Sequence, residues 1–188
     1  DLLPERSAHF SLNYDRGFSI SGHRVKTDVN FFFNDIDQQI AIAQSPSDPT
    51  STTYLNIEKF RTLGFNLVQQ VNFGAISGHL GMSYIGRYNR LSGESDALQS
   101  FFYTPELNAN LNYQLKKTKS SINLYYKYSG VQETYFLDDE DNVSIGQREA
   151  FHWMDLSLNQ KISNSLSLLL GARNLLNVRD INNSGVGT

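Results

Sequence analysis

The sequence predicts an all-β fold, an antiparallel β-barrel that crosses a membrane, and three observations lead to this prediction. Apolar and polar residues alternate along most of the 188-residue chain, which places successive side chains on opposite faces of extended strands. The alternating segments commonly run for about ten to thirteen residues, roughly twice the length of strands in globular sheets. Tight turns and long polar loops join them alternately, which is typical of outer-membrane barrels.

The first predicted hairpin begins with a strand at residues 8–20, where Phe10 and Asn13 represent the apolar and polar faces. A compact turn at residues 21–23 leads into the return strand. Polar residues then dominate from residue 34 to residue 56, and this segment contains two prolines. Because proline cannot lie in a central strand, we expect the first long loop there.

Three further hairpins repeat this pattern. Their strands are expected at about residues 63–73 and 76–88, 107–115 and 122–128, and 154–162 and 166–172. Their tight turns are expected at residues 74–75, 116–119 and 163–165, and the two remaining long loops at 89–103 and 130–149. The sequence therefore predicts about eight strands in four hairpins, with the tight turns on one side of a membrane and the long loops on the other.

Composition excludes several classes of protein. A net charge of -3 is too small to indicate nucleic-acid binding, and the absence of cysteine excludes a disulfide scaffold. The first residues lack the basic start and apolar stretch of a signal peptide, and no stretch approaches the 18 apolar residues of a membrane helix. A mean hydropathy of -0.40 remains compatible with membrane strands. Apolar and polar residues alternate in such strands, so their hydropathies cancel in the mean.

Aromatic residues gather at the strand ends nearest the long loops, where an interfacial girdle of a barrel is expected. The predicted girdle consists of Tyr84, Tyr88, Tyr126, Tyr128 and Trp153. The opposite face is rich in Asn, Gln, Ser and Gly, as expected for a wet lumen.

Two residues interrupt the apolar face, since Arg16 and Gln69 share its parity. A lipid-facing arginine costs about 2–4 kcal/mol at the bilayer midplane and much less near the interface. Arg16 lies only a few residues from its turn, so its side chain can extend towards the membrane surface. Gln69 is a weak point in the pattern.

Other candidate sites are few. The acidic residues Asp138, Asp139 and Asp141 could bind Ca²⁺, but they lack the spacing and glycine of a calcium loop, so a solvated loop tip is favoured. The four histidines have no metal-ligand spacing. No phosphate loop or nucleophile–base pair is recognisable, and we expect neither a cofactor nor enzymatic activity.

Four segments resemble motifs of TonB-dependent outer-membrane receptors, in the order and spacing of the C-terminal part of that barrel. They lie at residues 3–7, 33–37, 54–65 and 174–178. Two positions depart from the family pattern: Asn66 stands where an acidic residue is common, and Leu176 stands where phenylalanine is usual.

The resemblance implies that residues 1–188 are late strands of a barrel of about 22 strands, with the N-terminal plug and the final strand outside this sequence. It implies active uptake of a scarce nutrient (siderophore, haem, cobalamin or glycan) across the outer membrane of a Gram-negative bacterium. The implied partners are outer-membrane lipid, the remaining barrel strands, the TonB complex acting through the plug, and a surface-exposed lipoprotein as a further candidate.

Four charged residues have lumen-facing parity in this arrangement: Asp28, Arg87, Lys127 and Arg173. They could contact a plug or a polar solute, or form salt bridges with one another across the inner wall. Two alternative functions stay open, a complete eight-stranded barrel with a structural or adhesin role and a soluble β-sandwich or lipocalin-like binder. Alternation alone does not separate them, because a soluble antiparallel sheet has the same pattern.

Overall fold

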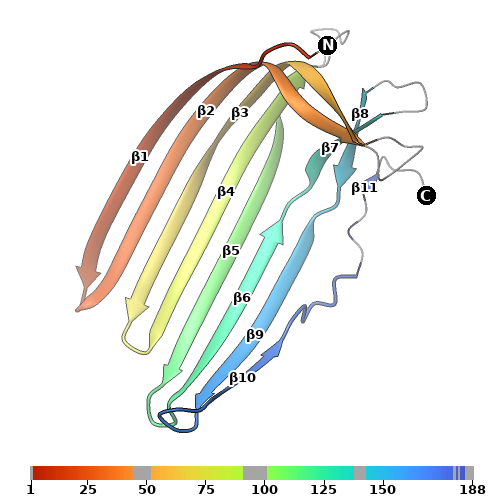
Figure 1. The fold of residues 1–188 in the computed structure, drawn as a ribbon. Helices are drawn as coiled ribbons and strands as arrows, with labels where there is room; N and C mark the ends of the chain where they lie inside the picture. The colour runs from red at the N-terminus through yellow and green to blue at the C-terminus, as the bar shows by residue number, and fades with distance from the viewer. Residues whose placement is uncertain are drawn as a thin grey trace.

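The computed structural model describes residues 2–44, 52–90, 101–137, 143–179, 181 and 183–184. These residues form one strongly curved sheet, and none of them lies in a helix (Figure 1). The strands are β1 (Arg6–Ile20), β2 (His23–Gln44), β3 (Thr52–Phe73), β4 (Ile76–Arg90), β5 (Phe102–Leu115), β6 (Ser120–Ser129), β7 (Gln132–Leu137), β8 (Val143–Arg148), β9 (Phe151–Lys161), β10 (Ser167–Ala172) and β11 (Asn183–Ser184).

Strands that are neighbours in the sheet are mostly neighbours in the chain. Strands β1 to β6 follow one another as an antiparallel meander, after which β9 pairs with β6 and β10 pairs with β9. Strands β7 and β8 pair with each other beyond the ends of β6 and β9. The predicted all-β antiparallel meander with eight main strands is therefore confirmed.

The tight turns lie where the sequence predicts them. Ser21 and Gly22 have φ angles of 50° and 81° and join β1 to β2. Two consecutive left-handed residues make a type I′ turn, whose twist matches that of the paired strands. Gly74 between β3 and β4 has a φ of 66°, and Lys119 before β6 has a φ of 56°. Left-handed residues thus shape the turns of the first three hairpins.

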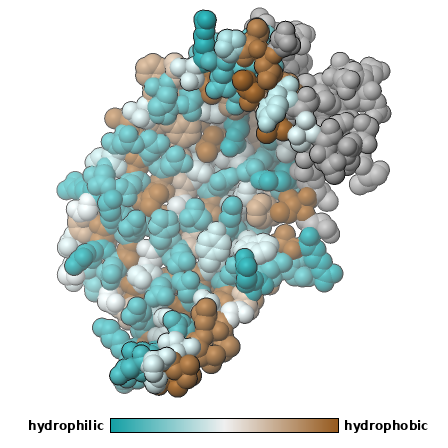
Figure 2. Space-filling model, viewed as in Figure 1, coloured by the Kyte–Doolittle hydropathy of each residue, from teal (hydrophilic) through white to brown (hydrophobic). Residues whose placement is uncertain are grey.

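The register sorts side chains onto an apolar face and a polar face. Phe10 pairs with Phe33, which pairs with Leu63, so these three form one row of the apolar face. The polar face is the opposite side of the same strands, and Figure 2 shows a mainly hydrophilic surface over the sheet. Apolar side chains such as Phe10 and Leu111 remain 67% and 46% exposed. No second layer of protein covers the apolar face within the part of the chain that the structure describes.

The first predicted loop is wrong in its extent. The structure continues β2 to Gln44 and begins β3 at Thr52, so most of residues 34–56 are paired strand. Charged residues replace apolar ones here, and they face oppositely charged partners across the strands, as Asp37 does with Lys59. Cross-strand ion pairs and backbone pairing hold polar strands together where no apolar face is needed.

The other two predicted loops also contain more strand than expected. Strand β4 runs to Arg90 and β5 begins at Phe102, which shortens the predicted loop at residues 89–103. The loop predicted at residues 130–149 contains the β7–β8 hairpin. The short strand β11, which pairs with β8, was not predicted. The acidic run with Asp138, Asp139 and Asp141 lies outside the described residues.

Candidate functional site

Asparagine side chains form a hydrogen-bonded ladder across the polar face of β1, β2 and β3. Asn30 donates through Nδ2 to Oδ1 of Asn13 over 2.6 Å, and Asn66 donates through Nδ2 to Oδ1 of Asn30 over 3.3 Å. The register makes these residues direct cross-strand neighbours. Amide groups both donate and accept, so such a face can bind water and polar solutes without a net charge.

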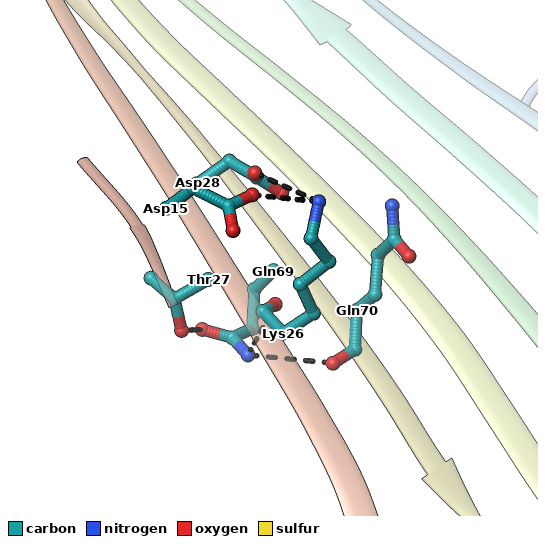
Figure 3. Close-up of polar contacts among 6 residues, drawn as sticks. All are labelled: Asp15, Lys26, Thr27, Asp28, Gln69 and Gln70. Atoms are coloured by element: carbon teal, nitrogen blue, oxygen red, sulfur yellow. Dashed lines mark hydrogen bonds and ion pairs between the residues drawn. The ribbon is translucent and has the colours of Figure 1, made fainter. Parts of the chain in front are cut away.

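Lys26 lies between two carboxylates on the same face (Figure 3). Its Nζ atom is 2.7 Å from Oδ2 of Asp15 and 3.0 Å from Oδ1 of Asp28. Asp28, one of the four charged residues predicted to face the lumen, therefore forms an ion pair within the wall.

The structure does not bring the other three predicted charged residues together. Arg87 on β4 donates through Nη1 to Oγ1 of Thr104 over 3.2 Å. Lys127 on β6 lies over the ring of Phe151, with its Nζ 5.9 Å from the centroid. Arg173, after β10, lies 3.7 Å from Asp155. Each of them has a separate neighbour, so they form no common cluster.

Four of the five predicted girdle residues, all tyrosines, lie on the apolar face. Tyr84 stacks on Tyr103 with ring centroids 5.1 Å apart, and Tyr88 packs against Phe101 at 5.7 Å. Tyr126 and Tyr128 both pack against His152, at 6.1 and 4.7 Å.

Trp153 differs from the four tyrosines in its position. The register pairs it with Lys127 on the polar face, because its parity is opposite to that of its neighbour Met154. Its inclusion in the girdle is therefore corrected: a single residue of offset moves a strand side chain to the other face.

A cluster of charged side chains lies on the same face of the sheet as the apolar residues. It follows the pair Phe33 and Leu63, in the direction away from the tight turns. Lys59 Nζ is 2.9 Å from Asp35 and 2.7 Å from Asp37, and Arg61 Nε is 3.0 Å from Asp35. Sequence reasoning missed this cluster because Asp35 and Asp37 were assigned to a loop, and Lys59 and Arg61 were assigned to no strand. The order of apolar, aromatic and charged residues along the strands is the order that a membrane interface requires.

Gln69 and Thr27 explain the weak point in the apolar pattern (Figure 3). They are cross-strand partners, and Thr27 donates through Oγ1 to Oε1 of Gln69 over 2.7 Å. Gln69 in turn donates through Nε2 to the carbonyl oxygen of Lys26 over 3.0 Å. The pair satisfies its own hydrogen bonds, so it does not require water.

A groove of about 750 Å³ lies where β1 to β5 approach their tight turns, bordered mostly by polar-face residues. Its lining includes Arg24, Lys26, Gln70, Asn72, His79 and Asn110. The described residues contain no group of three acidic, histidine or cysteine side chains that could hold a metal ion. The groove is therefore suited to water or a polar solute.

The β7–β8 hairpin contacts the polar face of β4 and β5. Asn89 donates through Nδ2 to Oε2 of Glu133 over 3.2 Å, and Gln132 donates through Nε2 to Oε1 of Glu106 over 2.7 Å. Burial raises the pKa of the Glu133 carboxyl, and the nearby positive charge of Arg87 partly opposes that shift. The sequence gives no signal for this contact, because it depends on how the chain bends after β6.

Comparison with solved structures shows the same fold in outer-membrane receptors. The FrpB iron transporter from Neisseria meningitidis is 16% identical with a TM-score of 0.67, covering 95% of this chain and 28% of that chain. The ferripyoverdine receptor of the outer membrane of Pseudomonas aeruginosa is 13% identical with a TM-score of 0.61, covering 90% and 24%. The FpvAI protein in its complex with pyocin S2 is 16% identical with a TM-score of 0.64, covering 93% and 24%.

The chain thus spans about a quarter of the length of these solved proteins. No curated protein sequence matches it. None of the described residues forms a helix long and apolar enough to cross a membrane. The family model described as "TonB dependent receptor-like, beta-barrel" matches residues 1–175. With its uncovered apolar face, its amide-lined polar face and this match over nearly its whole length, the chain belongs to the TonB-dependent receptor β-barrel family.

Proposed function

We propose that residues 1–188 form late wall strands of a receptor that imports a scarce nutrient across the outer membrane. The observation that carries this proposal is the pairing of an apolar face, with exposed side chains on β1 to β5, β9 and β10, with a hydrogen-bonded amide face on the other side of β1 to β3. Lipid on one side and water on the other satisfy both faces. The family consists of receptors and transporters rather than enzymes.

The free edges of the sheet support further barrel strands outside this sequence. Within the described residues, the 15-residue strand β1 pairs only with β2, and the six-residue strand β10 pairs only with β9. Lipid does not tolerate open sheet edges, so strands of the same parent protein would pair with both. A closed eight-stranded barrel would instead require β1 to pair with β10.

The substrate class to test first is an iron chelate. Two of the similar solved proteins are named as an iron transporter and a ferripyoverdine receptor, and a neutral amide lining accepts polar solutes of many kinds. Haem, cobalamin and glycans are the other candidates. We propose that uptake draws energy from the TonB complex through a plug domain, and that outer-membrane lipid and a surface-exposed lipoprotein are further partners.

Uptake by the full-length receptor tests this function. A strain lacking its own iron-chelate receptors would express the protein, and accumulation of radiolabelled iron would be measured with a panel of ferric chelates, with and without functional TonB. We expect TonB-dependent accumulation of at least one chelate. A receptor that is correctly inserted but imports none of the panel would overturn the iron assignment, and haem, cobalamin and glycans would follow.

Native mass and detergent dependence separate the two alternatives. A transporter parent should far exceed the 21.3 kDa of this sequence, whereas a small complete barrel should not. A soluble binder should stay monomeric in buffer without detergent.

A further inference from the structure

Strand β2 continues past the start of β1, and one of its edges is left without a strand partner there. The ladder between β1 and β2 ends at the pair Arg6 with Asp37, whereas β2 stays paired with β3 to its end at Gln44. On the edge opposite β3, the next strand contact is the single parallel pair of Gln44 with Phe136 on β7. Figure 1 shows β2 and β3 continuing past β1 and bending towards β7 and β8. Among the described residues, no strand pairs with this edge at residues 38–43.

The sequence of this open edge is of a kind that pairs readily with other strands. Residues 38–44 read QQIAIAQ, without a charged residue, a proline or a glycine. Ile40 and Ile42 are 41% and 57% exposed. The segment lies past the charged cluster that contains Lys59 and Arg61, so it is outside the apolar part of the wall. An uncharged, exposed edge with branched apolar side chains is a template for pairing with another molecule.

The chain before β1 crosses β2 at this edge instead of extending the ladder. Asn56 on β3 binds both backbone groups of Leu3: the Leu3 N–H donates to Oδ1 over 2.8 Å, and Nδ2 donates to the Leu3 carbonyl oxygen over 3.1 Å. A side-chain amide carries the same donor and acceptor as a peptide group, so Asn56 takes the place of a neighbouring strand. Because β2 lies between β1 and β3, this contact requires residues 2–5 to cross β2.

The same amide also holds a bend in β2. Gln38 has a φ of 55°, which is unfavourable for a glutamine and persists only where the surrounding structure holds it. Asn56 donates through Nδ2 to the carbonyl oxygen of Gln38 over 2.8 Å. One side chain thus connects β3, the bend in β2 and the chain before β1. The contact joins residues 3–7 to residues 54–65, two of the four segments that resemble receptor motifs.

Glu5 occupies a backbone group of the open edge itself. Its Oε2 atom accepts a hydrogen bond from the backbone N–H of Ile40 over 3.1 Å. Ile40 is the direct partner of Asn56 in the ladder between β2 and β3, so both side chains act at the same level of the sheet. Pro4 has no N–H to offer to a ladder, and it favours an extended conformation of Leu3.

We propose that residues 2–5 are a strap that prevents the open edge of β2 from pairing with a second copy of this protein. Asn56 fastens the strap, and Glu5 occupies the N–H of Ile40 that an added strand would use. A second copy is the fitting partner because two identical edges without charge can pair antiparallel, with Ile40 and Ile42 of both copies side by side. The strap does not rest on the proposed transport function.

Hydrogen exchange on the full-length receptor in detergent or lipid tests the fastening. Asn56→Leu keeps the size of the side chain and removes its hydrogen bonds, so exchange of the Leu3 amide should become roughly tenfold faster. Glu5→Ala should have the same effect on the Ile40 amide, and Glu5→Gln should not, because it keeps an acceptor oxygen. Exchange of Leu3 that is unchanged in Asn56→Leu would overturn the fastening, as would a rise spread over all strands.

Asn174→Leu is the matched control for Asn56→Leu. Asn174 also binds both backbone groups of one residue, since Nδ2 donates to the carbonyl oxygen of Val178 and Oδ1 accepts from the Val178 N–H, each over 2.8 Å. This contact lies after β10, at the other end of the chain. Its loss should speed exchange of the Val178 amide and leave that of Leu3 unchanged. Faster exchange of Leu3 in this control would contradict a local fastening.

The molecular mass of the full-length receptor in detergent, measured by light scattering, tests the blocking of the edge. We expect the double variant Asn56→Leu, Glu5→Ala to form dimers or larger assemblies, and Asn174→Leu to keep the mass of the parent. Adding Ile42→Lys to the double variant should restore that mass, because a lysine on an edge strand opposes strand addition. A folded, heat-resistant double variant with the parent's mass would overturn the proposal. Association that Ile42→Lys does not reverse, or that Asn174→Leu shares, would overturn it as well.

Discussion

Thr27 and Gln69 are two polar residues on the apolar face whose side chains are hydrogen-bonded to each other. Their side chains are bonded to each other over 2.7 Å, and Gln69 is also bonded to the backbone of β2. A polar group facing hydrocarbon without a partner costs several kcal/mol, roughly, whereas a bonded pair costs far less.

A double-mutant cycle at this pair follows from that argument. Thr27→Val removes the donor and leaves Gln69 Oε1 unpaired, so it should lower the free energy of unfolding by about 1–2 kcal/mol. The double variant Thr27→Val, Gln69→Leu removes both partners and should recover most of that loss. Denaturant titration of the receptor in lipid vesicles measures both values, and purely additive losses would show that the pair does not interact.

Gly64 is a second residue whose identity is set by its neighbours. A Cβ atom there would clash with the carbonyl oxygen of Tyr84 on the adjacent strand. Gly64→Ala should therefore force β3 and β4 apart and lower the free energy of unfolding by about 1–3 kcal/mol. Gly17→Ala, which meets no atom, should change it much less, and equal effects of the two substitutions would contradict this account.

At the scale of the element, we expect the docking of the β7–β8 hairpin on β4 and β5 to depend on pH. Burial raises the pKa of Glu133, so the docked hairpin binds a proton more tightly than the released one. Docking is thus strongest when the carboxyl is protonated, and it weakens as the pH rises through the raised pKa. Arg87 on β4, Glu106 on β5 and Arg148 on β8 are the charged side chains around this position.

The expected result is greater protection of β7 amides near about pH 4 than near neutral pH, after correction for intrinsic exchange rates. Glu133→Gln should keep the hairpin docked at both values, because its side chain is neutral and its carbonyl oxygen can still accept from Asn89. Glu106→Gln serves as the control for the second carboxylate. A pH dependence that persists in Glu133→Gln would assign the effect to another group.

The four hairpins could be predicted from the sequence because their alternation has a period of two and short polar or glycine-containing segments separate the paired strands. The ends of the strands could not. Beyond Phe33 the alternation stops, yet Asp35, Asp37, Lys59 and Arg61 extend the ladder through ion pairs. Such pairs become visible only when the register is known.

The candidate site was predicted in part. Asp28, Arg87 and Lys127 lie on the polar face by their register. Their partners, Lys26 on the same strand and Thr104 and Phe151 on neighbouring strands, could not be identified before the strands were paired. The contact of Glu133 with Asn89 could not be predicted, because it requires the bend at Gly130 and the crowding by Pro105. Local patterns carry no information about such a bend.

At the scale of the whole molecule, the sheet has lipid on its apolar face and water on its polar face. Substitutions at neighbouring residues should therefore differ in their effect on the free energy of unfolding. Leu67→Arg on the apolar face should lower the free energy of unfolding in lipid by about 2–4 kcal/mol. Asn66→Arg, one residue earlier on the polar face, should lower it less, because it loses the hydrogen bond to Asn30 but keeps its side chain on the water side. Denaturant titration in vesicles measures both, and a reversed order would mean that the assignment of the faces is wrong.

The asparagine ladder has a consequence for the motion of a bound molecule. Neighbouring strands are about 4.8 Å apart and like-facing residues about 6.8 Å apart along a strand, so the polar groups recur at short, regular intervals. A guest sliding over Asn13, Asn30 and Asn66 can form its next hydrogen bond before it breaks the last one. The binding energy of the guest then changes little from one position to the next. The surface can bind the guest without holding it tightly at any one place.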